Sequence, residues 1–153
     1  MKPSLLYNFV EKRPDVFETL PVAELGSVGN LALADQLFKQ QRWQQAVERY
    51  KHVLASLDDG TKTQRDQIIF HLSYCLCKLE QWKPAAGFFN RLFKAHPNSK
   101  LLGRAACFYY VAAARVYTMD KNPENYTRYI SAIKKYLKLC TDQQDSCEAR
   151  YQL

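Results

Sequence analysis

The residues WQQAVERYKHVL (43–54) and WKPAAGFFNRLF (82–93) carry the same pattern at an offset of 39 positions. Each stretch begins with a tryptophan, has an alanine three positions later and has bulky side chains seven and eleven positions later. These positions share one face of a helix with 3.6 residues per turn, so the spacing predicts two amphipathic helices. Recurrence at a period of about 20–50 residues is typical of stacked helical repeats.

Length and composition also favour a helical chain. The sequence has 153 residues, 47% of them hydrophobic, which is enough apolar material for the core of one domain. Only 5 Gly and 6 Pro are present, which argues against a fold with many tight β-turns. We therefore expect an all-α chain in three parts: cap or docking helices at 1–25, repeats at 26–142, and a short helix at 143–153 where the chain could be truncated.

Capping residues and helix breakers divide the chain into predicted helices. Thr63, Ser99 and Asn122 stand where a side-chain oxygen can cap the first turn of a following helix. Pro97 disfavours helix at the residue before it and separates two of the predicted helices. The expected helices lie at 4–10, 29–41, 43–57, 63–79, 82–95, 101–119 and 123–140, with a shorter piece around Phe17.

The charge of the chain bears on its partner. With 22 Lys and Arg against 15 Asp and Glu, the net charge is +7. A basic balance favours an acidic partner such as an acidic peptide, an anionic lipid or a nucleic acid. The densest basic group, Lys134, Lys135 and Lys138, has helical spacing, so a solvated helix face is the simpler interpretation.

No pattern in the sequence indicates catalysis. The histidines His52, His71 and His96 stand on separate predicted elements, and neither a Gly-rich phosphate loop nor a Ser-His-Asp order accompanies them. The five cysteines include no CxxC pair, and we expect small buried thiols in a reducing compartment. We therefore expect a protein that is not an enzyme, with no catalytic residue, no metal site and no cofactor.

The hydropathy pattern argues against a membrane protein. The N-terminal residues lack the apolar core of a secretory signal. The longest nearly apolar run, at 105–114, has roughly half the length that a membrane-spanning helix needs. We expect no membrane association and a location in the cytoplasm or the nucleus.

The repeated stretches resemble tetratricopeptide repeats, whose unit is a helix pair, A and B, of about 34 residues. The matching positions in the first unit are Leu33, Ala34, Ala46, Tyr50 and Leu54, and those in the second are Leu72, Ser73, Ala85, Phe89 and the closing Pro97. The resemblance implies helix-turn-helix repeats at about 28–61, 67–100 and 101–140, stacked into a short right-handed superhelix. The third unit departs from the family pattern, because both of its helices must be longer.

In this family, residues of helix A line a concave groove that binds protein or peptide partners. Carried over by register, the groove residues would be Leu31, Asp35, Phe38, Lys39, Phe70, Tyr74, Lys78, Arg104 and Phe108. Such an aromatic and apolar channel suits a peptide with hydrophobic anchors, although neighbouring helices could instead fill it as core. Some family members clamp a terminal carboxylate with Lys, Asn and Arg. The matching positions here hold Leu31, Asp35 and Tyr74, which would not stabilise that charge.

The resemblance implies a non-catalytic interaction scaffold or adaptor, and two narrower similarities stay open. The stretches 13–17, 34–38 and 43–54 are similar to repeat subunits of the anaphase-promoting complex, whose N-terminal repeats dimerise, so a homodimer is one expectation. Three-repeat bacterial secretion chaperones have a similar length but are not expected to be so basic. A basic nucleic-acid-associated repeat protein is a further alternative, although we expect nucleic acid to be an improbable partner.

Overall fold

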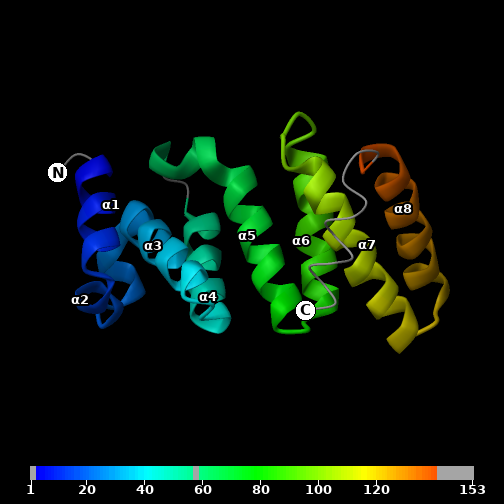
Figure 1. The fold of residues 1–153 in the computed structure, drawn as a ribbon, viewed down its shortest axis with the longest axis horizontal. Coiled ribbons are helices and arrows are strands. Elements are labelled where there is room, and N and C mark those ends of the chain that lie inside the picture. Colours follow the sequence, from blue (N-terminus) through cyan, green and yellow to red (C-terminus); the bar gives the residue numbers. More distant parts are fainter. Residues whose placement is uncertain (1–2, 57–58, 141–153) are drawn as a thin grey trace. The chain divides into compact units, whose positions relative to one another are not determined.

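The computed structural model describes residues 3–56 and 59–140, and every regular element within them is helical (Figure 1). This confirms the predicted all-α fold. The elements are α1 Pro3–Lys12, α2 Pro14–Glu18, α3 Val22–Lys39, α4 Trp43–Ala55, the 3-10 helix η1 Asp59–Gln64, α5 Arg65–Lys78, α6 Trp82–Ala95, α7 Leu102–Met119 and α8 Pro123–Leu139. They fall into two compact units, residues 1–79 and residues 80–153, which are described separately below.

In the first unit, consecutive helices pack side by side. Helix α3 packs on α4, α4 packs on α5, and α1 also contacts α3. Ala46 and Tyr50 of α4 are completely buried, as the repeated pattern requires for the inward face of this helix. The small alanine side chain allows close approach of a neighbouring helix, while the tyrosine fills the remaining space.

A left-handed residue ends the first helix of each repeated pair. Gln41 follows α3 with φ 60°, and Glu80 follows α5 with φ 57°, again 39 positions apart. After α3, the amide of Gln41 donates to the Phe38 carbonyl at 3.0 Å, and the amide of Arg42 donates to the Leu37 carbonyl at 2.9 Å. These two bonds form a Schellman motif, which satisfies the last carbonyls of the helix and turns the chain into the next one.

Within the first unit, two polar side chains, Asn30 of α3 and Arg49 of α4, bind the backbone of residues 18–26. Gly26 interrupts α3 with φ 63° and ψ −178°, and the buried amide of Asn30 donates to the carbonyls of Val22 and Gly26, both at 2.7 Å. The guanidinium of Arg49 in α4 donates to the Asn30 side-chain oxygen at 2.9 Å and to backbone carbonyls of the segment before α3. Burial lowers the pKa of Arg49, but its hydrogen bonds satisfy its donors.

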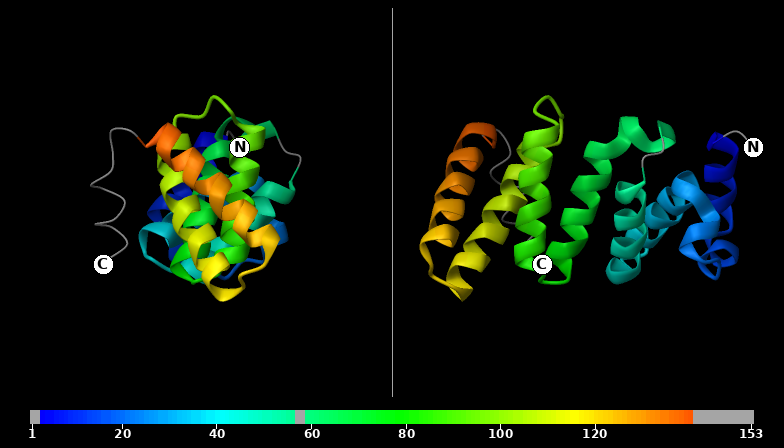
Figure 2. Two further views of the ribbon diagram at one scale, coloured as in Figure 1. Left: turned by 90° about the vertical axis from the view of Figure 1, so that its right-hand side faces the viewer. Right: turned by 180° about the vertical axis from the view of Figure 1, so that it is seen from behind.

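In the second unit, α6 packs on α7 and α7 packs on α8, and each of these pairs is antiparallel (Figure 2). Phe89 stacks on Phe108 with ring centroids 6.4 Å apart, and the Arg115 guanidinium lies over Trp82 at 5.7 Å. Between α7 and α8 the contact is a row of tyrosine rings, with centroids 5.3–6.0 Å apart: Tyr110, Tyr117, Tyr126, Tyr129 and Tyr136. Aromatic pairs at these distances add stability beyond the area that they bury.

Several predicted helix ends differ from the observed ones. The expected N-cap at Thr63 is wrong, because 59–64 form a 3-10 turn and α5 begins at Arg65 with no side-chain cap. Thr61 in this turn is buried and the turn packs on α3, so tertiary packing outweighs the local capping preference. The cap at Asn122 is confirmed, since its side chain accepts from the Asn125 amide at 2.8 Å. The predicted helix at 143–153 lies outside the described residues.

Candidate peptide-binding surface

Four aromatic side chains of α3, α4 and α5 form one cluster in the first unit. Phe38 stacks on the His71 ring with centroids 4.5 Å apart, and its ring lies 5.5 Å from both Trp43 and Tyr74. Trp43 also meets Tyr74 edge to face at 5.8 Å. All four side chains are partly exposed, so the cluster presents an aromatic surface and not a closed core. We name Phe38, Trp43, His71 and Tyr74 the aromatic cluster.

A cation borders the aromatic cluster. The ammonium of Lys78, one turn beyond Tyr74 on α5, lies 5.4 Å from the centroid of the Tyr74 ring. Lys78 itself is exposed. An exposed cation next to an aromatic surface can attract a carboxylate of a partner while the rings bury its apolar side chains.

Asp35, another expected groove residue, lies in a hydrogen-bond network within the unit. Its two carboxylate oxygens accept from the hydroxyls of Tyr7 at 2.8 Å and Tyr50 at 2.6 Å. The Tyr50 hydroxyl has one proton, which it gives to Asp35, so the 3.2 Å contact with His71 requires the imidazole Nδ1–H to donate. Burial, followed by the neighbouring Asp35, raises the pKa of both tyrosines above their usual value.

Helix α1 lies along part of the expected groove. Tyr7 and Glu11 are four residues apart on α1, and Asp35 and Lys39 are four residues apart on α3. Tyr7 bonds Asp35, and Glu11 pairs with Lys39 at 3.4 Å, so α1 contacts α3 at two successive turns of each helix. The N-terminal segment therefore engages Asp35 and Lys39, which the helical register assigns to a partner.

The remaining expected groove residues divide into buried and exposed ones. Leu31, Phe70 and Phe108 are 4%, 3% and 2% exposed, so they belong to the core and offer almost no surface to a partner. Phe108 packs on Phe89 within the second unit. Arg104 is exposed on α7, also in the second unit. The structure thus brings Phe38, Tyr74 and Lys78 together at one surface.

The sequence alone does not assign three residues at or next to this surface, Trp43, His71 and Tyr7, to the binding site. The repeated pattern identifies Trp43 only as a marker of the repeat, although its ring touches Phe38 and Tyr74. His71 stands as an isolated histidine in the sequence, and Tyr7 belongs to the expected N-terminal arm. The helical register contains a signal for His71, which lies three residues before Tyr74 and therefore on the same side of α5.

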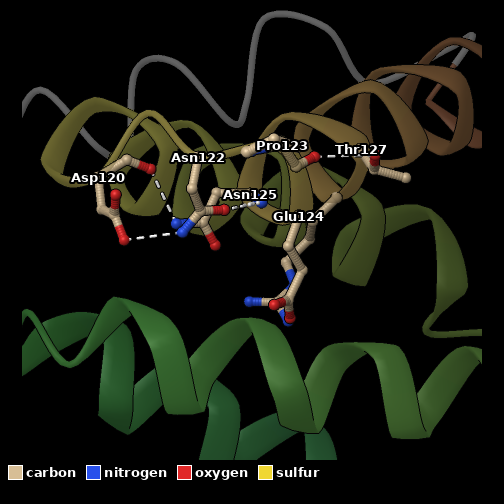
Figure 3. Close-up of polar contacts among 7 residues, drawn as sticks. Asp120, Asn122, Pro123, Glu124, Asn125 and Thr127 are labelled. Carbon is tan, nitrogen blue, oxygen red and sulfur yellow. Dashed lines mark hydrogen bonds and ion pairs between the residues drawn. The ribbon is translucent and has the colours of Figure 1, made fainter.

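The second unit has a pocket of about 330 Å³ near the start of α6 and the end of α7. Its apolar wall includes Trp82, Pro84, Val116 and Met119, of which Met119 is 77% exposed. The turn before α8 forms its polar edge, where the Asn125 side chain donates to the Asp120 carbonyl at 2.8 Å (Figure 3). This pocket has room for an apolar side chain of a partner.

Comparison with known families bears on the second repeated pair. Residues 67–99 match the family model of the tetratricopeptide repeat. This stretch is similar to a tetratricopeptide repeat. In the matched stretch, α5 takes the place of helix A and α6 that of helix B, and the pair α3 and α4 precedes them at the 39-residue offset. Neither a curated protein nor a solved structure gives a significant match to the chain.

Tetratricopeptide repeats are typically non-catalytic modules that bind other proteins, and stacked repeats present extended surfaces for this purpose. Within residues 3–56 and 59–140, no three His, Cys, Asp or Glu side chains gather in a group that could hold a metal ion. No helix in the described part of the chain has the length and apolar character to cross a membrane.

Proposed function

We propose that this protein is a non-catalytic scaffold or adaptor whose aromatic cluster binds a short segment of a partner protein. The observation that carries the proposal is the meeting of Phe38, Trp43 and Tyr74, partly exposed and drawn from three helices, beside the Lys78 ammonium. Large rigid rings bury much apolar area at a small cost in side-chain entropy, which is why aromatic residues dominate protein interfaces.

The charge of the chain supports an acidic partner segment. Residues 80–140 contain eleven Lys and Arg but only three Asp and Glu, which gives them a net charge of +8. Three carboxylates cannot pair with eleven cations, so a positive field surrounds these helices. Lys78 borders the aromatic cluster in the first unit, and the chain as a whole has a net charge of +7, so both favour a peptide that combines apolar anchors with Asp or Glu.

The experiment measures binding of such peptides by the fluorescence of Trp43. In a Trp82→Phe background, Trp43 is the only tryptophan, and it touches the proposed site. Peptides that combine Leu or Phe anchors with Glu are expected to shift its emission, while peptides with Lys in place of Glu are not. Phe38→Glu combined with Tyr74→Glu should abolish binding and leave the helical circular dichroism unchanged.

A matched control comes from the second unit. Tyr126→Glu combined with Leu137→Glu places the same two charges at residues of the second unit that are 51% and 68% exposed and do not belong to the aromatic cluster. This variant should bind the acidic peptides as the parent does. If the double change at Phe38 and Tyr74 leaves binding intact, the proposed site is wrong. Binding of a single-stranded oligonucleotide in place of the peptides would support the nucleic-acid alternative.

The N-terminal segment supports a second role, self-association. Leu5 and Phe9 are 48% and 55% exposed on one side of α1, and Val16 of α2 is 48% exposed. Such exposed apolar side chains would be buried if two copies met through this segment. The similarity to the N-terminal repeats of the seventh subunit of the anaphase-promoting complex favours a homodimer and a place in a multiprotein complex.

Light scattering should then show a dimer that Phe9→Glu converts to a monomer. A monomer at all concentrations removes this role.

A further inference from the structure

Two cysteines face each other where the end of α8 meets the beginning of α7. The Sγ atoms of Cys107, in α7, and Cys140, the residue after α8, lie 2.9 Å apart. Cys107 is 1% exposed and Cys140 is 6% exposed. A disulfide bond is about 2.05 Å long, so only a small closing movement separates these sulfur atoms from bonding distance.

The backbone around the pair fixes this approach. A Cβ atom on Gly103 would lie 3.1 Å from the carbonyl oxygen of Leu139, which is closer than ordinary van der Waals contact. Glycine at this position therefore lets the end of α8 come near α7. The Cys140 thiol donates to the Gly103 carbonyl at 3.0 Å, which orients its sulfur beside Cys107.

We propose that Cys107 and Cys140 are a modification site at which hydrogen peroxide forms an intramolecular disulfide. In the first step, the Cys140 sulfur attacks the peroxide, the O–O bond breaks, and the products are a sulfenic acid and one water molecule. In the second step, the Cys107 sulfur attacks the Cys140 sulfur, the S–O bond of the sulfenic acid breaks, and the sulfenic hydroxyl leaves with the Cys107 thiol proton as a second water. One peroxide is reduced, and two thiols are oxidised to one disulfide.

Cys140 is the residue expected to react first. It follows the last helical residue of α8, and helix ends open more easily than helix centres. Opening of this last turn admits peroxide without unfolding the unit, and reclosing returns Cys140 to Cys107. The other described thiols, Cys75 and Cys77, lie two positions apart on α5 and so point in different directions.

The disulfide would fasten the last turn of α8 to α7. It closes a loop of 33 residues that contains most of both helices, so it removes conformational freedom from the unfolded chain. For a domain of this size, the melting temperature is expected to rise by on the order of 10 °C. Peroxide would thereby control the stability of the packing between α7 and α8.

The test uses the full chain with Cys147→Ser, so that the peptide carrying Cys140 has a single cysteine. After treatment with hydrogen peroxide and blocking of remaining thiols, trypsin should release residues 105–115 joined to residues 139–150, two hydrogen atoms lighter than the separate peptides combined. A reductant should separate them and reverse the rise in melting temperature.

Two variants make the test specific. Cys140→Ser should lose both the joined peptide and the rise in melting temperature. Gly103→Ala should slow disulfide formation while keeping all thiols, because its Cβ pushes against the Leu139 carbonyl. The proposal is overturned if peroxide leaves Cys107 and Cys140 fully alkylatable after unfolding, converts Cys140 only to sulfinic acid, or joins two chains instead.

Discussion

The hydroxyl of Tyr50 lies 2.6 Å from Oδ1 of Asp35 and links the second helix of the first pair to the first. This bond explains why Asp35, although its register places it at the groove, is not available as a ligand-binding carboxylate. Its other oxygen accepts from Tyr7 of α1, and the His71 imidazole approaches Tyr50 at 3.2 Å. The polar network thus joins four helices beneath the aromatic cluster.

Tyr50→Phe tests the energetic weight of this network. The change keeps the ring in its fully buried site but removes the hydroxyl that bonds Oδ1 of Asp35 and contacts Nδ1 of His71, two atoms that lie 3.8 Å apart. Loss of such a partly buried, charge-assisted bond should lower the free energy of unfolding by about 1–3 kcal/mol. Urea unfolding followed by circular dichroism measures it. An unchanged unfolding midpoint would show that water replaces the hydroxyl without cost.

Ala46→Leu tests the packing of the first helix pair. Ala46 is completely buried, and three extra carbon atoms have no space there. Overpacking should lower stability by about 1–3 kcal/mol. The control is Ala55→Leu, at the exposed end of the same helix, which should change stability by less than about 0.5 kcal/mol. Equal thermal stability of the two variants would contradict the assignment of Ala46 as a contact position.

Gly26→Ala tests the interruption of α3. Gly26 has φ 63° and ψ −178°, a region that only glycine adopts readily, and no atom lies within 4 Å of the place that a Cβ atom would take. The cost is therefore conformational, about 1–3 kcal/mol. Gly87→Ala is the matched control, because it also has open space but lies inside α6, where alanine should add about 0.5–1 kcal/mol. Thermal shifts of the same sign in both variants would contradict this explanation.

Gln41→Gly should stabilise the protein. Gln41 holds φ 60° at the end of α3, where a side chain costs roughly 1–2 kcal/mol that glycine avoids. The greater freedom of glycine in the unfolded chain offsets part of the gain, so we expect about 0.5–1 kcal/mol. Glu80→Gly should act similarly after α5. Destabilisation of both variants would indicate that the Gln41 and Glu80 side chains make contacts that outweigh the backbone strain.

Stability should fall at alkaline pH. Burial raises the pKa of the Cys75 thiol from 9.0 to about 12, and the pKa values of Tyr7 and Tyr50 are also raised. Between the unfolded and folded pKa values, the unfolded chain binds fewer protons than the native one, so the free energy of unfolding decreases with pH. The stability that the protonated Cys75 thiol contributes is fully present below about pH 9. Urea titrations from pH 8 to 11 measure the slope, which Cys75→Ala should reduce.

The repeated helix pairs could be predicted because they depend on local patterns. Helix α6 begins and ends where its tryptophan, its proline in the first turn and the following His96-Pro97 indicate. The cap at Asn122 is likewise a short-range interaction that the sequence displays directly. The 3-10 turn at 59–64 could not be predicted, because the turn packs on α3 and buries Thr61, and this packing depends on residues far away in the sequence and not on local preference.

The candidate site was only partly predictable for a related reason. Helical register places Phe38, Tyr74 and Lys78 on compatible faces, and the structure brings them together. Register does not show how deeply a side chain is buried, however. Leu31 and Phe70 share those faces but lie in the core. Burial depends on which helix covers each turn, and that helix can come from far along the chain.

The sequence by itself determined the helical periods, the 39-residue repeat and the faces on which apolar side chains gather, since these follow from backbone geometry and local chemistry. Tertiary structure decided which of those faces stay open. It placed Tyr7 and Glu11 of α1 against Asp35 and Lys39, and it left Phe38 and Trp43 partly exposed. It also set Cys107 opposite Cys140, because the meeting of two sulfur atoms 33 positions apart depends on how the helices pack and not on the pattern within either.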